Sequence, residues 1–281
     1  MDKRYLSEGQ TAAFARALRA AERSPGTIEK YLRDVCQFAA WAGGGAVSRE
    51  RTAAWRDSQL EGGYAPVTVN SMVAAVNQFF TFLGWEDCKV KALKIQRKLF
   101  RDDRRELTRE EYQRLLDAAH GLGRERLALL LETICATGIR VSELRFITAE
   151  ALRAGRAEIR LKGKCRTVLL PRELAERLRQ YAGERDIREG PLFCTRTGQP
   201  LDRSNIWHEM KALCREAGVM PEKVFPHNLR HLFAKCFYEQ EKDLAHLADL
   251  LGHSSIETTR IYVAVSARAH EQILEKMRLI V

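Results

Sequence analysis

The carboxyl-terminal part of the chain carries a tyrosine, two histidines and an arginine whose side chains could do chemistry together. Tyr262 lies nine residues after His253, and His227 and Arg230 form a His-x-x-Arg segment upstream. A tyrosine can attack a phosphodiester and hold the product as a covalent phosphotyrosine, which preserves the bond energy for rejoining. Arginine can bind two phosphate oxygens and stays charged, while an imidazole can transfer a proton near pH 7. These residue types favour phosphodiester cleavage by a tyrosine nucleophile.

Two further segments could complete such a site. The segment ATGIRVSEL offers Arg140 as a second guanidinium, which would help to neutralise the non-bridging phosphate oxygens. The segment LKGKCR offers Lys162 or Lys164 as a general acid that would protonate the leaving oxygen.

Each of these signals is weak alone. Arg140 could make an ordinary surface ion pair, and Tyr262 could be a core residue of an amphipathic helix. His231 and His246 are interpreted as structural. The inference depends on the complete set in this order along the chain.

The elements that must position these residues are mainly helices. Residues 1–88 read as a first, helical domain, with a possible capping box from Ser7 to Gln10 and apolar residues every three or four positions in residues 28–39 and 69–83. A weaker helix is expected over 51–60.

Residues 89–106 are basic and lack apolar periodicity, so they are predicted to be an interdomain linker. A solvated loop without a function is the alternative. We expect phosphate contacts instead, because a linker between two domains that grip DNA must run close to the duplex. The candidates for DNA contact are Lys94, Arg97, Lys98 and Arg101, together with Lys164 from the predicted turn.

Residues 107–281 are predicted to form a second domain, which opens with a capping box from Thr108 to Glu111. Strands over 157–161 and 167–170 flank a Lys-Gly-Lys turn and predict a β-hairpin. The helices are expected over 112–119, 124–137, 172–181, 204–217, 229–239, 244–250, 258–263 and 267–277. The fold class is therefore mainly α with a small antiparallel β-sheet.

Composition restricts the partners and the compartment. The 281 residues carry a formal net charge of +10, which favours a polyanion such as nucleic acid. The seven cysteines are scattered without a C-x-x-C pair, and no acidic residue recurs with the histidines at metal-ligand spacing, so no metal or cofactor is expected. No signal peptide and no apolar run of about 20 residues is present, which favours a soluble cytoplasmic protein without a membrane partner.

In this order the motifs resemble those of the tyrosine recombinases, the phage integrase family. The resemblance implies that the catalytic residues are Arg140, Lys162, His227, Arg230, His253 and Tyr262, with Tyr262 as the nucleophile. The hairpin segment is one residue shorter than the family pattern Gly-Lys-Gly-x-Lys-x-Arg. Matching the first lysine selects Lys162, which we prefer, whereas counting back from Arg166 selects Lys164.

The resemblance also implies that residues 1–88 are the family's SAM-like core-binding domain, which binds DNA, and that residues 107–281 are its catalytic domain. Together they would form a C-shaped clamp on double-stranded DNA and assemble as a homotetramer on two recombination sites. A paired recombinase or accessory factors could join it. Strands would be exchanged through a 3′-phosphotyrosine intermediate and a Holliday junction, without metal or ATP. Residues 267–281 would form a helix that is donated to a neighbouring subunit, the alternative being that it packs on its own domain.

The biological role and the target site stay open at this point. A Xer-like dimer resolvase, a DNA invertase and a compact mobile-element integrase, which would integrate and excise DNA, fit equally well. A type IB topoisomerase, a hairpin-resolving enzyme and a catalytically silent DNA-binding protein are the alternatives.

Overall fold

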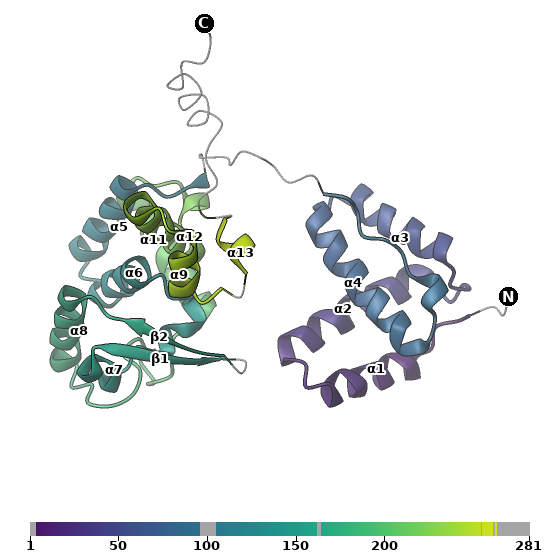
Figure 1. Ribbon diagram of the computed structural model, residues 1–281, viewed down its shortest axis with the longest axis horizontal. Coiled ribbons are helices and arrows are strands. Elements are labelled where there is room, and N and C mark those ends of the chain that lie inside the picture. Colours follow the sequence, from purple (N-terminus) through teal and green to yellow (C-terminus); the bar gives the residue numbers. More distant parts are fainter. Residues whose placement is uncertain (1–3, 96–104, 162–163, 254, 261, 263–281) are drawn as a thin grey trace, which may run out of the picture. The chain divides into compact units, whose positions relative to one another are not determined.

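The fold is given by a computed structural model, which describes residues 4–95, 105–161, 164–253, 255–260 and 262. The chain divides into two compact units, Met1–Arg97 and Lys98–Val281 (Figure 1). Within the described residues, no helix has the length and apolar character that crossing a bilayer requires. The predicted fold class is confirmed: the chain is mainly helical with one small antiparallel sheet.

The first unit is a set of helices around an aromatic core. Phe38 packs edge-on against Trp55 at 5.1 Å and against Phe80 at 5.6 Å between ring centroids, and all three side chains are fully buried. The predicted capping box at Ser7 and Gln10 is present. The helices are α1 (Glu8–Ala20), α2 (Pro25–Ala42), α3 (Arg49–Glu61), α4 (Pro66–Leu83) and the 3-10 helix η1 (Glu86–Cys88).

Two asparagines of α4 hold the chain that follows η1. The Asn77 side chain accepts from the Val90 N–H at 3.2 Å and donates to the Val90 carbonyl at 2.8 Å. Asn70 makes the same pair of bonds with Leu93, at 2.7 and 2.9 Å. Residues 89–93, the start of the predicted linker, are therefore fixed on the first unit as an extended segment. Lys94, a DNA-contact candidate, follows directly and is exposed.

The second unit contains most of the helices and the sheet. The capping box at Thr108 and Glu111 is confirmed, and it opens the helix α5. The elements are α5 (Arg109–Gly121), α6 (Glu125–Thr137), the 3-10 helix η3 (Val141–Phe146), α7 (Ala149–Ala154), β1 (Arg156–Leu161), β2 (Lys164–Leu169), α8 (Arg172–Glu184), α9 (Arg203–Lys211), α10 (Cys214–Ala217), the 3-10 helix η4 (Pro221–Lys223), α11 (Pro226–Glu241), α12 (Leu244–Leu251) and α13 (Ile256–Arg260).

The sequence placed two of these elements wrongly, and it did not predict the helix α7. The helix expected over 204–217 is interrupted, and it forms α9 and α10. The helix expected to begin at residue 229 begins at Pro226, because the fixed backbone angle and missing N–H of proline suit the first helical position. This second difference matters, since it places His227 in the first turn of α11. The predicted hairpin is present, and its pairing ends with Leu161 opposite Lys164.

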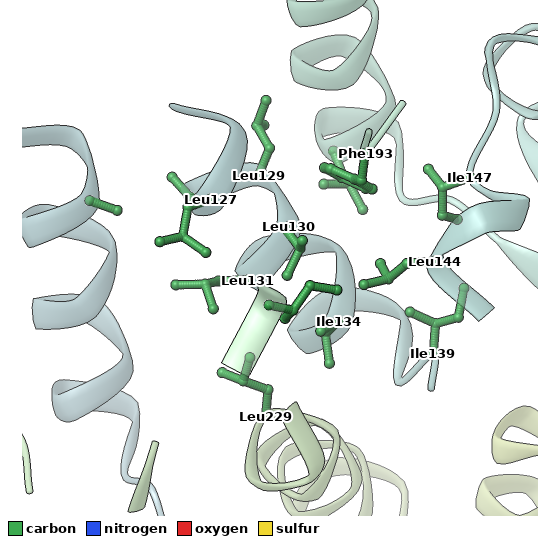
Figure 2. Close-up of a cluster of buried hydrophobic side chains, with 14 of the residues drawn as sticks. Leu127, Leu129, Leu130, Leu131, Ile134, Ile139, Leu144, Ile147, Phe193 and Leu229 are labelled. Atoms are coloured by element: carbon green, nitrogen blue, oxygen red, sulfur yellow. The ribbon is translucent and has the colours of Figure 1, made fainter. Parts of the chain in front are cut away.

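Helix α6 lies at the centre of the second unit (Figure 2). Most of its side chains from Leu127 to Thr137 are buried, as expected for an element that packs against several neighbours. Leu127, Leu130 and Ile134 have exposed fractions of 0–1%. Helices α5, α8 and α11 pack against it. The carboxyl-terminal end of α6 is therefore held rigidly, and the candidate site begins there.

Replacing both Asn70 and Asn77 by alanine should release residues 89–93. Each asparagine bonds one backbone N–H and one carbonyl, so we expect each loss to raise the population of the open segment by about tenfold. Limited trypsin digestion followed by mass spectrometry should then show faster cleavage after Lys89 and Lys91. The exposed Asn205 in the second unit gives a matched control, Asn205→Ala. Equal cleavage rates in the wild type and the double variant would contradict this account.

Candidate active site

Gly138 ends α6 and turns the chain toward the site. Its backbone is left-handed, with φ of +62°, and an added Cβ would lie 2.5 Å from the Phe233 ring and 2.9 Å from Leu251. Only glycine fits both the angle and the space. The turn places Arg140 two residues later at the start of η3, and it directs the Gly138 carbonyl at Arg230.

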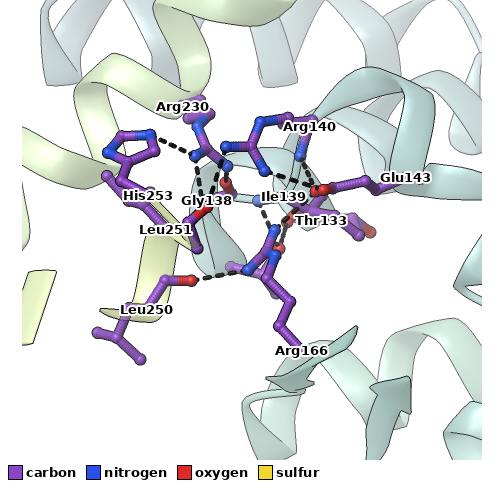
Figure 3. A network of polar contacts seen from close by, with 12 residues as sticks. Thr133, Gly138, Ile139, Arg140, Glu143, Arg166, Arg230, Leu250, Leu251 and His253 are labelled. Atoms are coloured by element: carbon purple, nitrogen blue, oxygen red, sulfur yellow. Dashed lines mark hydrogen bonds and ion pairs between the residues drawn. The ribbon is translucent and has the colours of Figure 1, made fainter. Parts of the chain in front are cut away.

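Arg230 lies on α11 and is almost completely buried, with 2% of its surface exposed. Its guanidinium donates to the Gly138 carbonyl, to the Leu251 carbonyl at 2.7 Å and to Nε2 of His253 at 2.9 Å (Figure 3). All of these acceptors are neutral. The positive charge is thus held in place by hydrogen bonds without being cancelled.

Arg140 and Arg166 share one carboxylate. Glu143 accepts from Arg140 at 3.0 Å and from Arg166 at 2.6 Å, and it also accepts from the Arg140 backbone N–H. Arg166 comes from β2 and donates to the Leu250 carbonyl at 2.7 Å, so it joins the hairpin to the end of α12. In the described part of the chain, Glu143 is the one carboxylate bound by this cluster of three guanidinium groups, and only Arg140 and Arg166 bind it, which leaves the cluster short of negative charge.

The environment keeps these groups charged. Burial, and next the charge of Arg140, lower the pKa of Arg230 to about 10, which still leaves it protonated at neutral pH. Burial alone would raise the pKa of Glu143. The hydrogen bonds from the Arg140 backbone and the Arg166 guanidinium outweigh it, so the pKa lies below its ordinary value. The cluster therefore offers a fixed, positively charged site for an anion.

Tyr262 lies among three imidazole rings. Its side chain is 6% exposed, and its hydroxyl lies 3.4 Å from Nε2 of His227. The ring centroids of His231 and His253 lie 5.0 and 5.5 Å from that of Tyr262. The described part of the expected helix 258–263 is α13, which ends at Arg260, so Tyr262 follows it in a turn. Of the three rings, that of His227 is placed to accept the phenolic proton.

The charged groups border an open cleft of about 650 Å³, which is lined by Arg140, Glu143, Arg166 and His253 among others. A larger hollow of about 920 Å³ is lined by residues at the other end of α6, including Arg124 and Arg126. A helix of 13 residues spans about 20 Å. The larger hollow is lined by Tyr181 and His208 as well, but Arg140, Arg166 and His253 are not among its lining residues. The smaller cleft is the candidate site.

Most of the predicted site residues come together. Five of them converge from different elements: Arg140 from the turn between α6 and η3, His227 and Arg230 from α11, His253 from the end of α12, and Tyr262 from the turn after α13. Lys162 lies outside the described residues, as do the DNA-contact candidates Arg97, Lys98 and Arg101. Lys164 is the first residue of β2, and its side chain is outside the described part. The roles of all these residues remain predictions.

Sequence reasoning missed several residues that shape the site. The motifs contain Glu143, Arg166 and Thr259, but only the contacts of these residues in the structure identify them as parts of the hydrogen-bond network of the site. His231 was interpreted as structural, and the structure places its ring against Tyr262. Its position four residues after His227 on a helix was the available signal, since residues at this spacing lie on the same face.

We expect the imidazole of His253 to remain neutral far below the ordinary range. Burial, and then the charges of Arg230, Arg140 and Arg166, lower its pKa to about 4. Because the folded-state pKa lies below the unfolded value, the contribution of His253 to stability is complete above about pH 6.5 and is lost as the pH falls toward 4. An NMR titration of protein with ¹⁵N-labelled histidine measures this, with His253→Gln assigning the resonance. Titration of His253 near pH 6.5 would contradict the geometry.

Comparisons with known proteins agree with this geometry. Residues 105–268 match the phage integrase family, and residues 12–87 match the phage integrase N-terminal SAM-like domain. The chain is 32% identical over 268 residues to tyrosine recombinase XerA of Thermococcus kodakarensis, covering 92% of this chain and 91% of that protein. It is 33% identical over 277 residues to tyrosine recombinase XerD of Xanthomonas campestris pv. campestris, covering 88% and 84%.

Solved structures share the fold. XerH bound to its difH substrate before cleavage aligns with a TM-score of 0.70 at 22% identity, over 92% of this chain and 82% of that one. A lambda integrase tetramer bound to a Holliday junction aligns with a TM-score of 0.75 at 17% identity, over 93% and 78%. With its sequence matches, its fold and its tyrosine-centred cationic site, the chain belongs to the phage integrase family and is a tyrosine-type site-specific recombinase.

Proposed function

We propose that the protein breaks and rejoins DNA through Tyr262, with the guanidinium cluster holding the scissile phosphate. The observation that carries this proposal is the cluster itself. Arg140 and Arg166 share the carboxylate of Glu143, and Arg230 is buried among neutral acceptors. A phosphodiester would supply the missing negative charge, and Arg140 and Arg230 would bind its non-bridging oxygens.

Cleavage would proceed by direct displacement. The Tyr262 oxygen gives its proton to Nε2 of His227 and attacks phosphorus, while the bond from phosphorus to the 5′-oxygen breaks. A 3′-phosphotyrosine forms, and the 5′-oxygen leaves with a proton donated by Lys162. Rejoining is the reverse reaction with a 5′-hydroxyl from the partner duplex. The phosphotyrosine conserves the bond energy, so no nucleotide is consumed.

The partners follow from the same proposal. The related structures contain XerH bound to difH and a lambda integrase tetramer on a Holliday junction. We infer that this chain likewise binds double-stranded DNA and assembles as a homotetramer on two sites in the cytoplasm. The linker arginines and lysines would contact phosphates, and residues 267–281 would join neighbouring subunits. The choice between integration, inversion and dimer resolution depends on the target site.

Replacing Tyr262 by phenylalanine should abolish covalent capture of DNA. The protein is incubated with a pool of nicked duplexes, including fragments that flank its own gene, without metal or nucleotide. Protein-linked DNA is then isolated and sequenced. We expect wild-type adducts that share a motif, and a loss of about a thousandfold or more in the variant, which has no nucleophile.

Tyr181→Phe is the matched control, because Tyr181 is also 6% exposed and lies in α8, remote from the site. Its adducts should equal those of the wild type. Adducts that persist in Tyr262→Phe would refute the proposed nucleophile. DNA binding without any adduct would favour a silent DNA-binding protein instead.

Separate Lys162→Ala and Lys164→Ala variants should identify the general acid. Pairing of β1 with β2 ends at Leu161 and Lys164, on either side of residues 162–163. Loss of the acid should slow cleavage of an ordinary phosphodiester by about 10² to 10⁴-fold. A 5′-bridging thio substrate, whose leaving group needs no proton, should restore the rate of that variant. We expect this behaviour from Lys162→Ala, and full activity of both variants on ordinary DNA would exclude a hairpin lysine.

A further inference from the structure

Both ring nitrogens of His253 have a defined partner. Nε2 lies 2.9 Å from Nη2 of Arg230, and Nδ1 lies 2.8 Å from the hydroxyl oxygen of Thr259. A guanidinium nitrogen can only donate, so Nε2 must accept. A neutral imidazole has one N–H, which must then be on Nδ1 and must donate to Thr259. The contacts therefore select one of the two neutral tautomers.

Thr259 is placed to hold the histidine and the tyrosine together. It lies in α13 and is fully buried, with 0% of its surface exposed. Its side chain receives the Nδ1–H of His253, and its carbonyl accepts from the Tyr262 N–H at 2.9 Å. The His253 backbone is itself fixed, since its N–H donates to the Ala248 carbonyl at the end of α12.

The tautomer matters because it decides whether Nε2 of His253 can accept a hydrogen bond from Arg230. With the proton on Nδ1, Nε2 has a free lone pair, which serves as the third neutral acceptor around the buried guanidinium. With the proton on Nε2, two N–H donors would face each other and the contact would be lost. The Arg230 guanidinium would then lack one of the bonds that fix its orientation toward the cleft.

We propose that Thr259 is a positioning residue of the recombinase: its hydroxyl fixes His253 as the Nδ1–H tautomer, and His253 thereby orients Arg230 for the scissile phosphate. The inference rests on the proposed function for its catalytic consequence. The tautomer itself is a property of the protein without DNA, and it can be tested separately.

The test is long-range ¹H–¹⁵N NMR of the full chain at pH 7 with ¹⁵N-labelled histidine, with His253→Gln assigning the resonances. The wild type should show the Nδ1–H tautomer. Thr259→Ser keeps the hydroxyl and should keep the tautomer. Thr259→Val keeps the shape and removes the acceptor, so the tautomer ratio should change by about tenfold.

Thr52→Val is the matched control, because Thr52 in the first unit is also 0% exposed and its hydroxyl donates to the Ser48 carbonyl at the start of its own helix. It should leave the His253 resonances unchanged. An Nε2–H tautomer in the wild type would overturn the proposal, whether or not the Thr259→Val variant folds. So would an unchanged tautomer ratio in a folded Thr259→Val variant.

A second readout tests the catalytic consequence. On a duplex recovered by covalent capture, Thr259→Val should form the adduct about tenfold more slowly in a single turnover, and Thr259→Ser should restore the rate. A changed tautomer with an unchanged rate would overturn the positioning role. Adducts that form in Tyr262→Phe would instead refute the proposed nucleophile, and the NMR result would still decide the tautomer.

Discussion

The structure of the second unit depends on burying positive charge that its own carboxylates do not balance. Removing a guanidinium from water is costly unless every N–H finds an acceptor. Backbone carbonyls at the ends of α6 and α12 serve Arg230, and the carboxylate of Glu143 serves the other two arginines. Helix ends have free carbonyls because their last turn lacks hydrogen-bond partners. The site therefore lies where helices end.

This constraint explains why glycines occur at both of those helix ends. Gly138 and Gly252 adopt left-handed backbone angles, with φ of +62° and +63°. An added Cβ at Gly252 would lie 2.4 Å from Cδ of Arg166. Each glycine thus reverses the chain and also leaves room for a neighbouring side chain of the network. The packing of α5, α8 and α11 against α6 holds one of these ends still.

The sequence predicted the kind of structure and a set of site residues, most of which the structure brings together, but it did not predict the supporting network. Capping boxes and hairpins depend on local chemistry, so the pair Thr108 and Glu111 and the pairing of β1 with β2 could be predicted directly. The start of α11 at Pro226 and the break between α9 and α10 are also local, but periodicity alone does not locate them. Arg166 contacts segments that are distant in sequence, and the contact of Thr259 with His253 depends on the direction of its side chain. The spacing of residues along the chain reveals neither kind of contact.

The anchoring of residues 89–93 has a consequence for the proposed binding of DNA by both units. On the other side, the Arg105 carbonyl accepts from Asn228, and Leu107 is buried in the second unit. The chain between Leu93 and Arg105 can therefore span at most about 40 Å. Under the proposed function, a tether this short would give the second unit a high effective concentration at a duplex bound by the first, on the order of millimolar. Binding of the duplex by one unit would then favour binding by the other.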